Sequence, residues 1–216
     1  MLRHDPGPFA SARLVYRAVD PQEDVPFLLD LALDSDAEMA MNPGIPRVRA
    51  LQSLCILSVN ANHVVQPPSR ANIEEYADSL VKEYLLSVII CLPPIESQTI
   101  APPVPIGYLT LSQMSSSSAV HRRSNIGINI AAAYRSKGYG GEAIEWALGW
   151  GFRRAGLHRI GLGYVAWNAG AGRLYQKLGF VNEGVRRDFF WADDRWWDSV
   201  EMSILEGEWR AKNAGT

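Results

Sequence analysis

The chain has 216 residues, of which 47% are hydrophobic and 20% are charged, and its formal net charge is −2. This composition is typical of a globular chain that buries a core, and it excludes a disordered one. The small net charge gives no electrostatic reason to expect nucleic acid or another polyanion as a partner.

The amino-terminal segment 1–12 contains proline, glycine, histidine and aspartate where a signal peptide needs an apolar stretch. The longest apolar run, residues 85–92, is too short to span a bilayer. The two cysteines, Cys55 and Cys91, have the spacing neither of metal ligands nor of a disulfide framework. We therefore expect a cytoplasmic protein, or one shared between cytoplasm and nucleus, without membrane contact.

The first half of the chain predicts a strand, two helices and two further strands, in that order. Their ranges are 13–19 (strand), 24–34 (helix), 71–84 (helix, with Ser69 as its N-cap and apolar positions that include Val81 and Tyr84), 85–91 (strand) and 106–114 (strand). Residues 42–68 give no clear prediction. Five prolines over 93–105 indicate a loop, and the four serines over 115–118 indicate a turn.

An isoleucine-rich strand follows at residues 126–130, Ile-Gly-Ile-Asn-Ile. Its alternation places three isoleucines on one face, which packs on a core, and only Gly127 and Asn129 on the other. A face with such small side chains leaves room for a ligand to lie against it.

A glycine-rich turn, Arg-Ser-Lys-Gly-Tyr-Gly-Gly at 135–141, then leads into a helix with an apolar stripe through Ile144 and Leu148. Glycines at such a junction permit positive φ and close approach of the backbone. The first amides of a helix have no internal acceptor, and the helix dipole adds partial positive charge there. Phosphate oxygens are natural ligands of this arrangement, and Arg135 and Lys137 add cations.

Two other phosphate-binding motifs compete for the same residues. The spacing Gly138-x-Gly140-x-x-Ala143 also fits the dinucleotide fingerprint. However, the next strand ends at Trp167 without the acidic residue that holds a ribose, and the rest of the chain lacks further parallel strand-helix units. A P-loop is excluded because no Lys-Ser/Thr pair follows the glycines.

Two motifs in the second half resemble those of the GNAT acetyltransferase superfamily. The string 135–140 is similar to the signature Gln/Arg-x-x-Gly-x-Gly/Ala, and Asn168 followed by Leu-Tyr-Gln-Lys-Leu-Gly-Phe at 174–180 is similar to the second family segment. The similarity continues through Glu183-Gly184 and ends near Trp209. The similarity rests on motifs over residues 106–209 and on the order of elements over residues 12–91. Within the superfamily, the chain most resembles the branch of ribosomal-protein N-terminal acetyltransferases.

The resemblance implies an α/β (α+β) fold with one mixed, strongly twisted sheet of about seven strands flanked by helices. The central parallel strands, here 126–131 and 160–166, are expected to splay apart. A single domain would span residues 12–210, with flexible termini at 1–11 and 211–216 and the proline-rich loop 92–105 inside it.

The resemblance also implies acetyl-CoA as co-substrate and no metal. The pyrophosphate would lie on the amides of the glycine turn, and the pantetheine arm would run beside the strand that precedes it. The implied cofactor contacts come from Ile128, Asn129, Ile130, Arg135, Lys137, Gly138, Tyr139, Gly140, Gly141 and Asn168. Tyr175 matches the tyrosine proposed as general acid in this family, although it can also be read as a packed aromatic of its helix.

The sequence leaves the base and the acceptor open. The strand before the glycine turn has no carboxylate, so the candidates are a water molecule, His121, or the carboxylates Glu183, Asp188, Asp198 and Glu201. An acceptor amine with a low enough pKa would need little help from any base. The segment 189–197, Phe-Phe-Trp-Ala-Asp-Asp-Arg-Trp-Trp, predicts a hairpin whose aromatics either cradle a cationic amine or lock the strands together.

We therefore expect direct acetyl transfer to an amine of a small molecule or to a peptide N-terminus, by a monomer or homodimer. The alternative is a non-catalytic module that binds acyl-CoA.

Overall fold

The computed structural model describes residues 7–40, 69–94, 102–113, 116–192 and 194–214. Residues 42–68, residues 95–101 of the predicted proline-rich loop, and Asp193 in the predicted hairpin turn lie outside this range. Within the described part of the chain, no helix has the length and apolar character needed to cross a membrane.

A single seven-stranded mixed sheet forms the centre of the fold, with strands in the order β1-β2-β3-β4-β5-β7-β6. All neighbours are antiparallel except β4 and β5, which are parallel. The strands are β1 Val15–Ala18, β2 Tyr84–Leu92, β3 Val104–Ser112, β4 Arg123–Ile130, β5 Arg159–Val165, β6 Val181–Ala192 and β7 Arg195–Leu205. The helices are α1 Val25–Ala40, α3 Arg70–Lys82, α4 Tyr139–Arg153, α5 Ala169–Leu178 and α6 Glu206–Asn213, with 3-10 helices η1 Ser116–His121 and η2 Ala132–Tyr134. The predicted mixed sheet is confirmed.

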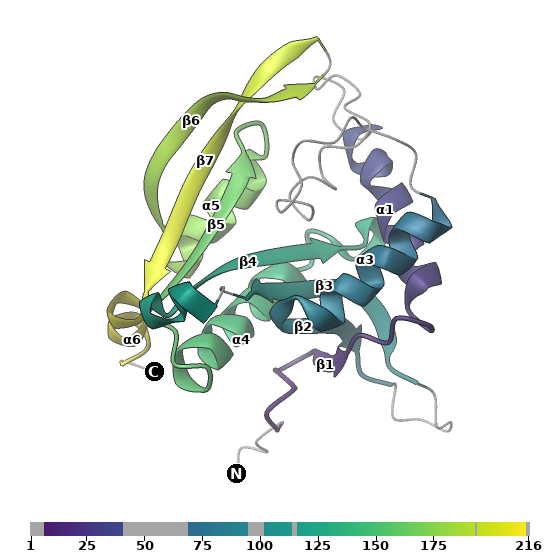
Figure 1. The fold of residues 1–216 in the computed structure, drawn as a ribbon, viewed down its shortest axis with the longest axis horizontal. Helices are drawn as coiled ribbons and strands as arrows, with labels where there is room; N and C mark the ends of the chain where they lie inside the picture. Colours follow the sequence, from purple (N-terminus) through teal and green to yellow (C-terminus); the bar gives the residue numbers. More distant parts are fainter. Residues whose placement is uncertain (1–6, 41–68, 95–101, 114–115, 193, 215–216) are drawn as a thin grey trace.

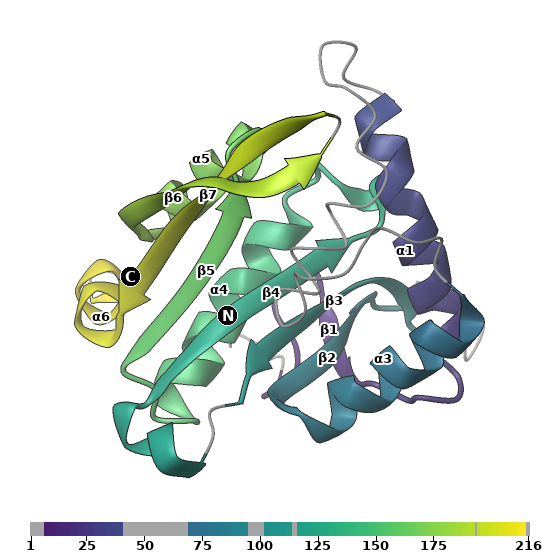
Figure 2. The same ribbon diagram turned by 45° about the horizontal axis from the view of Figure 1, so that its top comes forward.

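Helices cover both faces of the sheet, and each face has its own apolar core. Helices α1 and α3 lie over the β1–β3 half on one face, and α4 lies behind the sheet on the other (Figures 1 and 2). Strand β2 contributes to both cores, because Val88 and Ile90 pack with α4 whereas Ile89 and Cys91 pack with α1 and α3. A continuous apolar run such as 85–91 is typical of a strand that is buried on both faces.

Strands β4 and β5 are paired only near their amino-terminal ends. Their register runs from Arg123–Arg159 to Asn125–Gly161, and beyond it the strands diverge, as both views show (Figures 1 and 2). Strand β4 continues to pair with β3 and β5 with β7, so each strand follows a different half of the sheet. The result is a V-shaped opening at the carboxyl ends of two parallel strands, as expected.

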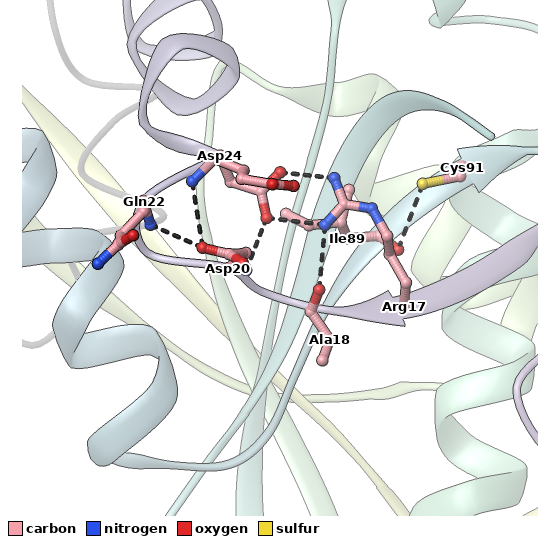
Figure 3. A network of polar contacts seen from close by, with 8 residues as sticks. Arg17, Ala18, Asp20, Gln22, Asp24, Ile89 and Cys91 are labelled. Carbon is pink, nitrogen blue, oxygen red and sulfur yellow. Dashed lines mark hydrogen bonds and ion pairs between the residues drawn. The ribbon is translucent and has the colours of Figure 1, made fainter. Parts of the chain in front are cut away.

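An ion pair between the partly exposed Arg17 and the buried Asp24 joins β1 to the start of α1 (Figure 3). The terminal nitrogens of Arg17 donate to the two carboxylate oxygens of Asp24 at 2.5 and 2.8 Å, and Asp24 is 2% exposed. The Asp20 amide donates to the same carboxylate at 2.8 Å. Hydrogen bonding to Asp24 raises the pKa of Arg17. This corner directs α1 toward η2, which it contacts beside the V.

Helix α3 begins as predicted but ends earlier. Ser69 caps it by accepting a hydrogen bond from the Asn72 amide. Tyr84 was expected on its apolar face, but that residue has left the helix and pairs with Ser112 at the start of β2. Val81, expected on the same face, is 53% exposed. Strand pairing with β3 therefore overrides the helical pattern in the last turn.

Other boundaries also differ from the predictions. Strand β2 extends to Leu92 and β3 begins at Val104, so paired residues occupy both ends of the predicted loop 92–105. The serine segment enters a 3-10 helix, η1, rather than a simple turn. Helix α6 was not predicted, because Trp209 is its one buried residue and gives no apolar periodicity.

Described residues outside the predicted domain limits of 12 and 210 also pack against the domain. Ala10 forms an isolated bridge with Val15, and the Trp146 indole on α4 donates to the Pro8 carbonyl at 3.2 Å. At the other end, Lys212 Nζ donates to the Lys177 carbonyl at 2.8 Å. Residues 7–11 and 211–213 therefore contribute contacts to the fold.

Candidate active site at the opening between two strands

The edge of β4 that lines the V presents backbone hydrogen-bonding groups. The Ala131 amide donates to the Ile106 carbonyl on the β3 side at 2.8 Å, and the direction of these groups alternates along a strand. The groups of Ile128 and Ile130 therefore point toward the V, whereas those of Asn129 point toward β3. Of the three residues predicted beside a pantetheine arm, Ile128 and Ile130 have the suitable backbone orientation.

The isoleucine face of β4 packs on a core, as predicted. Ile126 is buried, and Ile128 and Ile130 pack against the same core. On the other face, a β-carbon at Gly127 would lie 2.9 Å from the Thr110 hydroxyl, so this glycine also allows β3 and β4 to pack closely. Gly127 and Asn129 are half-buried, and the space expected beside them for a ligand stays a prediction.

The glycine turn lies at the start of α4, beyond the carboxyl end of β4. Gly138 is the N-cap residue and has a φ of 84°, in the left-handed region that glycine tolerates best. The helical ladder starts with the Glu142 amide, which donates to the Gly138 carbonyl at 3.2 Å. The amides of Tyr139, Gly140 and Gly141 consequently have no acceptor inside the helix. Together with the helix dipole, these amides have the arrangement that was predicted to attract an anion.

Arg13 brings a further cation to this turn. Its guanidinium donates to the Lys137 carbonyl at 3.2 Å and lies 4.8 Å from the centre of the Tyr139 ring. Arg13 and Lys137 are 124 residues apart in sequence, so no local motif signals their proximity. For that reason Arg13 could not be assigned to the site from the sequence.

Glu142 anchors Arg13 and the amino-terminal segment to α4. Its carboxylate accepts hydrogen bonds from the Ser11 hydroxyl, the Arg13 amide and Arg13 Nε, each at 2.7 Å. Burial raises the pKa of Glu142, but these hydrogen bonds and the Arg13 charge outweigh it, so the net pKa lies below its usual value. The ionised carboxylate also suits the positive end of the helix dipole.

The two cations predicted from the turn itself contact backbone carbonyls. Arg135 is half-buried, and its Nε donates to the Ile130 carbonyl at 2.6 Å, which ties the turn to the end of β4. Lys137 is exposed, and its Nζ donates to the Ala133 carbonyl at 2.8 Å. The flexible lysine can rotate toward a bound phosphate.

Asn168 has a structural role as the N-cap of α5. Its side-chain oxygen accepts from the Ala171 amide at 3.0 Å, so its remaining donor for a cofactor is Nδ2. Gly141 lets α5 approach the glycine turn, because a β-carbon there would lie 3.2 Å from Leu174 Cδ1.

Tyr175 follows Leu174 and is half-buried beside the V. Its ring centre lies 5.8 Å from that of Tyr164 and 5.9 Å from that of Phe180. Tyr164 belongs to the part of β5 that has diverged from β4. The ring of Tyr175 thus packs against Tyr164 and Phe180, and it is the neighbouring Leu174 that contacts the glycine turn. The role of Tyr175 as general acid stays a prediction.

Two of the candidate bases lie at the paired end of β4 and β5, away from the opening. His121 is exposed and ends η1, before the amino end of β4. Glu183 forms an ion pair with Arg159, the first residue of β5, and accepts from Ser203 Oγ at 2.7 Å. Hydrogen bonds from Arg159 and Ser203 lower the pKa of Glu183 to about 2, which makes it a poor base at neutral pH.

The other three carboxylates lie along the β6–β7 hairpin. Asp188 is exposed at a bulge with a φ of 50°, and its amide donates to Asp198 Oδ1 at 2.9 Å. Glu201 lies opposite Gly163 of β5, and its carboxylate oxygens lie 3.2 and 3.3 Å from the position of a β-carbon on Gly163. Of these carboxylates, Glu201 extends over the diverged part of β5.

The hairpin aromatics pack on one another. Trp191 pairs with Trp196, with ring centres 5.2 Å apart, and Trp197 packs against Trp167 at 4.7 Å. The Arg195 guanidinium already lies 3.6 Å from the centre of the Trp197 ring. These contacts favour the interpretation that the aromatics lock the hairpin. Among the residues the structure describes, no group of three or more metal-binding side chains gathers.

Comparisons with known proteins agree with this geometry. The family model for the acetyltransferase (GNAT) domain matches residues 13–181. The uncharacterized N-acetyltransferase YoaA of Bacillus subtilis is 33% identical over 101 residues, which cover 47% of this chain and 54% of that protein. The spermidine N(1)-acetyltransferase of Vibrio cholerae is 33% identical over 90 residues (42% and 52%), and the ribosomal protein uS5-alanine N-acetyltransferase of Escherichia coli is 31% identical over 84 residues (39% and 43%). The chain spans about half the length of the curated relatives it matches.

Solved structures cover nearly the whole fold. A spermidine N-acetyltransferase from Vibrio cholerae in complex with CoA and spermine aligns with a TM-score of 0.67 and 22% identity, over 92% of this chain and 99% of that one. A GNAT-family acetyltransferase from Bacillus anthracis aligns with a TM-score of 0.64 and 18% identity, over 93% and 99%. With the family model matched over most of its length, the chain belongs to the GNAT acetyltransferase family.

Proposed function

We propose that this protein transfers the acetyl group of acetyl-CoA directly to the nitrogen of an amine. The observation that carries the proposal is the V between β4 and β5, with the amino end of α4 beside its open end. The amides of residues 139–141, with Arg13 and Lys137 nearby, suit the diphosphate of the cofactor. The backbone of Ile128 suits the amides of the pantetheine arm, which would lie against β4 as an added strand.

The reaction requires one new bond and two proton movements. The neutral amine attacks the thioester carbonyl, the C–S bond breaks, and the nitrogen loses a proton to water or to a protein base. The CoA thiolate leaves and gains a proton, which we assign to the hydroxyl of Tyr175 as general acid. The named substrates of the relatives, spermidine and an alanine of ribosomal protein uS5, support a small amine or a peptide N-terminus as acceptor.

Two measurements test this function. CoA should raise the melting temperature and NAD should not, because a ligand bound only by the native state stabilises it. With acetyl-CoA, free thiol should then be released in the presence of at least one amine from a panel of spermidine, an alanine-terminated peptide, an aminoglycoside and an aryl amine. A shift with NAD but none with CoA would contradict the proposal.

The alternative is a CoA-binding module without turnover. It is motivated by β4, Arg-Ser-Asn-Ile-Gly-Ile-Asn-Ile, which has no carboxylate to serve as base. Stabilisation by CoA without thiol release for any amine of the panel would favour this alternative.

A further inference from the structure

We propose that Glu201 binds the ammonium group of the acceptor amine beside the V, on the face of β5 away from α4 and α5. The inference rests on the proposed acetyl transfer, and it identifies the residue that selects a cationic acceptor.

The register of the sheet places Glu201 next to the opening. Gly161 is the last residue of β5 that pairs with β4, and Gly163, two residues further, lies opposite Glu201 of β7. Leu162 and Tyr164 belong to the core beneath α4 and α5. Because side chains alternate along a strand, Gly163 and Glu201 lie on the other face, where Gly163 is exposed.

Because Gly161 and Gly163 have no side chains, the side chains of neighbouring strands can lie over β5 on this face. The Glu201 carboxylate lies over Gly163, with Oε2 at 3.2 Å and Oε1 at 3.3 Å from the position of a β-carbon. At the point where the strands part, Asn125 Oδ1 lies 2.9 Å from the corresponding position on Gly161. An uncharged acceptor and a carboxylate therefore follow one another along β5, as an ammonium with several N–H donors requires.

One oxygen of Glu201 is left for a ligand. Oε1 accepts from the Ser199 hydroxyl at 3.0 Å and lies 3.4 Å from Arg186 Nε, in a pair whose arginine is 59% exposed. Such an exposed pair is weak, because water screens both charges. Oε2 has no hydrogen-bond partner among the described residues. The glutamate side chain is 32% exposed, so partial desolvation strengthens a charge-assisted bond to an ammonium.

Two other carboxylates of this region, those of Glu183 and Asp198, have different partners. Glu183 is held by Arg159 and Ser203 at the paired end of the strands. Asp198 accepts a hydrogen bond from the Asp188 amide. Val200, two residues after Asp198 on β7, lies in the core beneath α5. The alternation along β7 therefore places Asp198 on the opposite face from Glu201.

The test is calorimetric titration of the CoA-saturated protein with spermidine and with alaninamide. Wild type should bind at least one of these amines, and Glu201→Gln should weaken that binding by on the order of tenfold, the effect of removing one charge from a charge-assisted bond. Gly163→Ala should weaken the binding to a smaller extent, because the added β-carbon displaces the Glu201 carboxylate but leaves its charge in place. Glu145→Gln, on the exposed face of α4, changes the net charge equally and should bind as wild type does.

The controls separate this inference from the proposed function. Stabilisation by CoA should be the same in all four proteins, and its loss in wild type would count against the function itself. If CoA stabilises wild type but neither amine binds, or if Glu201→Gln binds both amines with wild-type affinity, the assignment of Glu201 is overturned.

Discussion

At the scale of single residues, Tyr175 can be separated from its packing role. Tyr175→Phe keeps the ring contacts with Tyr164 and Phe180 and removes the hydroxyl. We expect kcat to fall roughly ten- to a thousandfold while the affinity for CoA stays the same, as for the loss of a general acid. Tyr164→Phe is the matched control, because its hydroxyl packs against Gly172 of α5. Wild-type turnover in Tyr175→Phe would remove the residue from catalysis.

The glycine turn offers a second test at this scale. Gly138 and Gly156 both have positive φ, 84° and 65°, so valine strains the backbone at either position. A β-carbon at Gly138 would lie in the proposed anion site, 3.3 Å from the Arg13 guanidinium, whereas one at Gly156 meets no atom within 4 Å. Both variants should lose stability, but Gly138→Val alone should weaken CoA binding, by about tenfold or more if one charged hydrogen bond is lost. Equal CoA affinity of the two variants in calorimetry would argue against the anion site.

The residues that sequence analysis identified belong to local motifs. The glycine turn, the N-cap Asn168 and Tyr175 are signalled by neighbours within a few positions. Arg13 reaches the turn only through the packing of the amino-terminal segment on α4. The position of Glu201 over β5 depends on strand register, which the sequence alone does not give.

At the scale of elements, the corner between β1 and α1 depends on one ion pair. Arg17→Ala would leave the buried Asp24 carboxylate without its charge partner, so we expect a loss of about 3 kcal/mol in the free energy of unfolding. Arg70→Ala breaks an exposed pair with Glu74 on α3 and should cost less than about 1 kcal/mol. Chemical denaturation of both variants measures the difference. Similar losses would mean that the Arg17–Asp24 pair contributes no more than a surface pair.

Elements were predictable where periodicity and caps agreed. Ser69 and the apolar spacing of α3 located that helix, and the isoleucine alternation located β4. The end of α3 was missed because the competing interaction, pairing of Tyr84 with Ser112, joins distant segments. Helix α6 was not predictable because a mostly polar helix with one buried tryptophan has no apolar stripe.

At the scale of the whole molecule, the sheet is continuous where β4 and β5 pair at their amino-terminal ends and open where these strands diverge. The order of elements and the two family motifs were enough to predict a mixed sheet with splayed parallel strands. The residues that hold the paired end together were not predictable, because they come from three strands. Arg159 begins β5, Glu183 lies on β6, and Ser203 lies on the β7 strand between them.

This three-strand contact should make stability depend on pH in a defined window. Hydrogen bonds from Arg159 and Ser203 lower the pKa of Glu183 from 4.5 to about 2. A lowered carboxyl pKa stabilises the folded state above the unfolded pKa, and this contribution is lost as the pH falls through the folded pKa. The stability difference between wild type and Glu183→Gln should therefore be constant above about pH 4.5 and shrink as the pH falls from 4.5 to about 2. Ser203→Ala removes one of the hydrogen bonds and should narrow this window from its acidic side. Denaturation curves across that range measure the difference, and a gap between wild type and Glu183→Gln that does not change with pH would show that the contact does not perturb the carboxyl group.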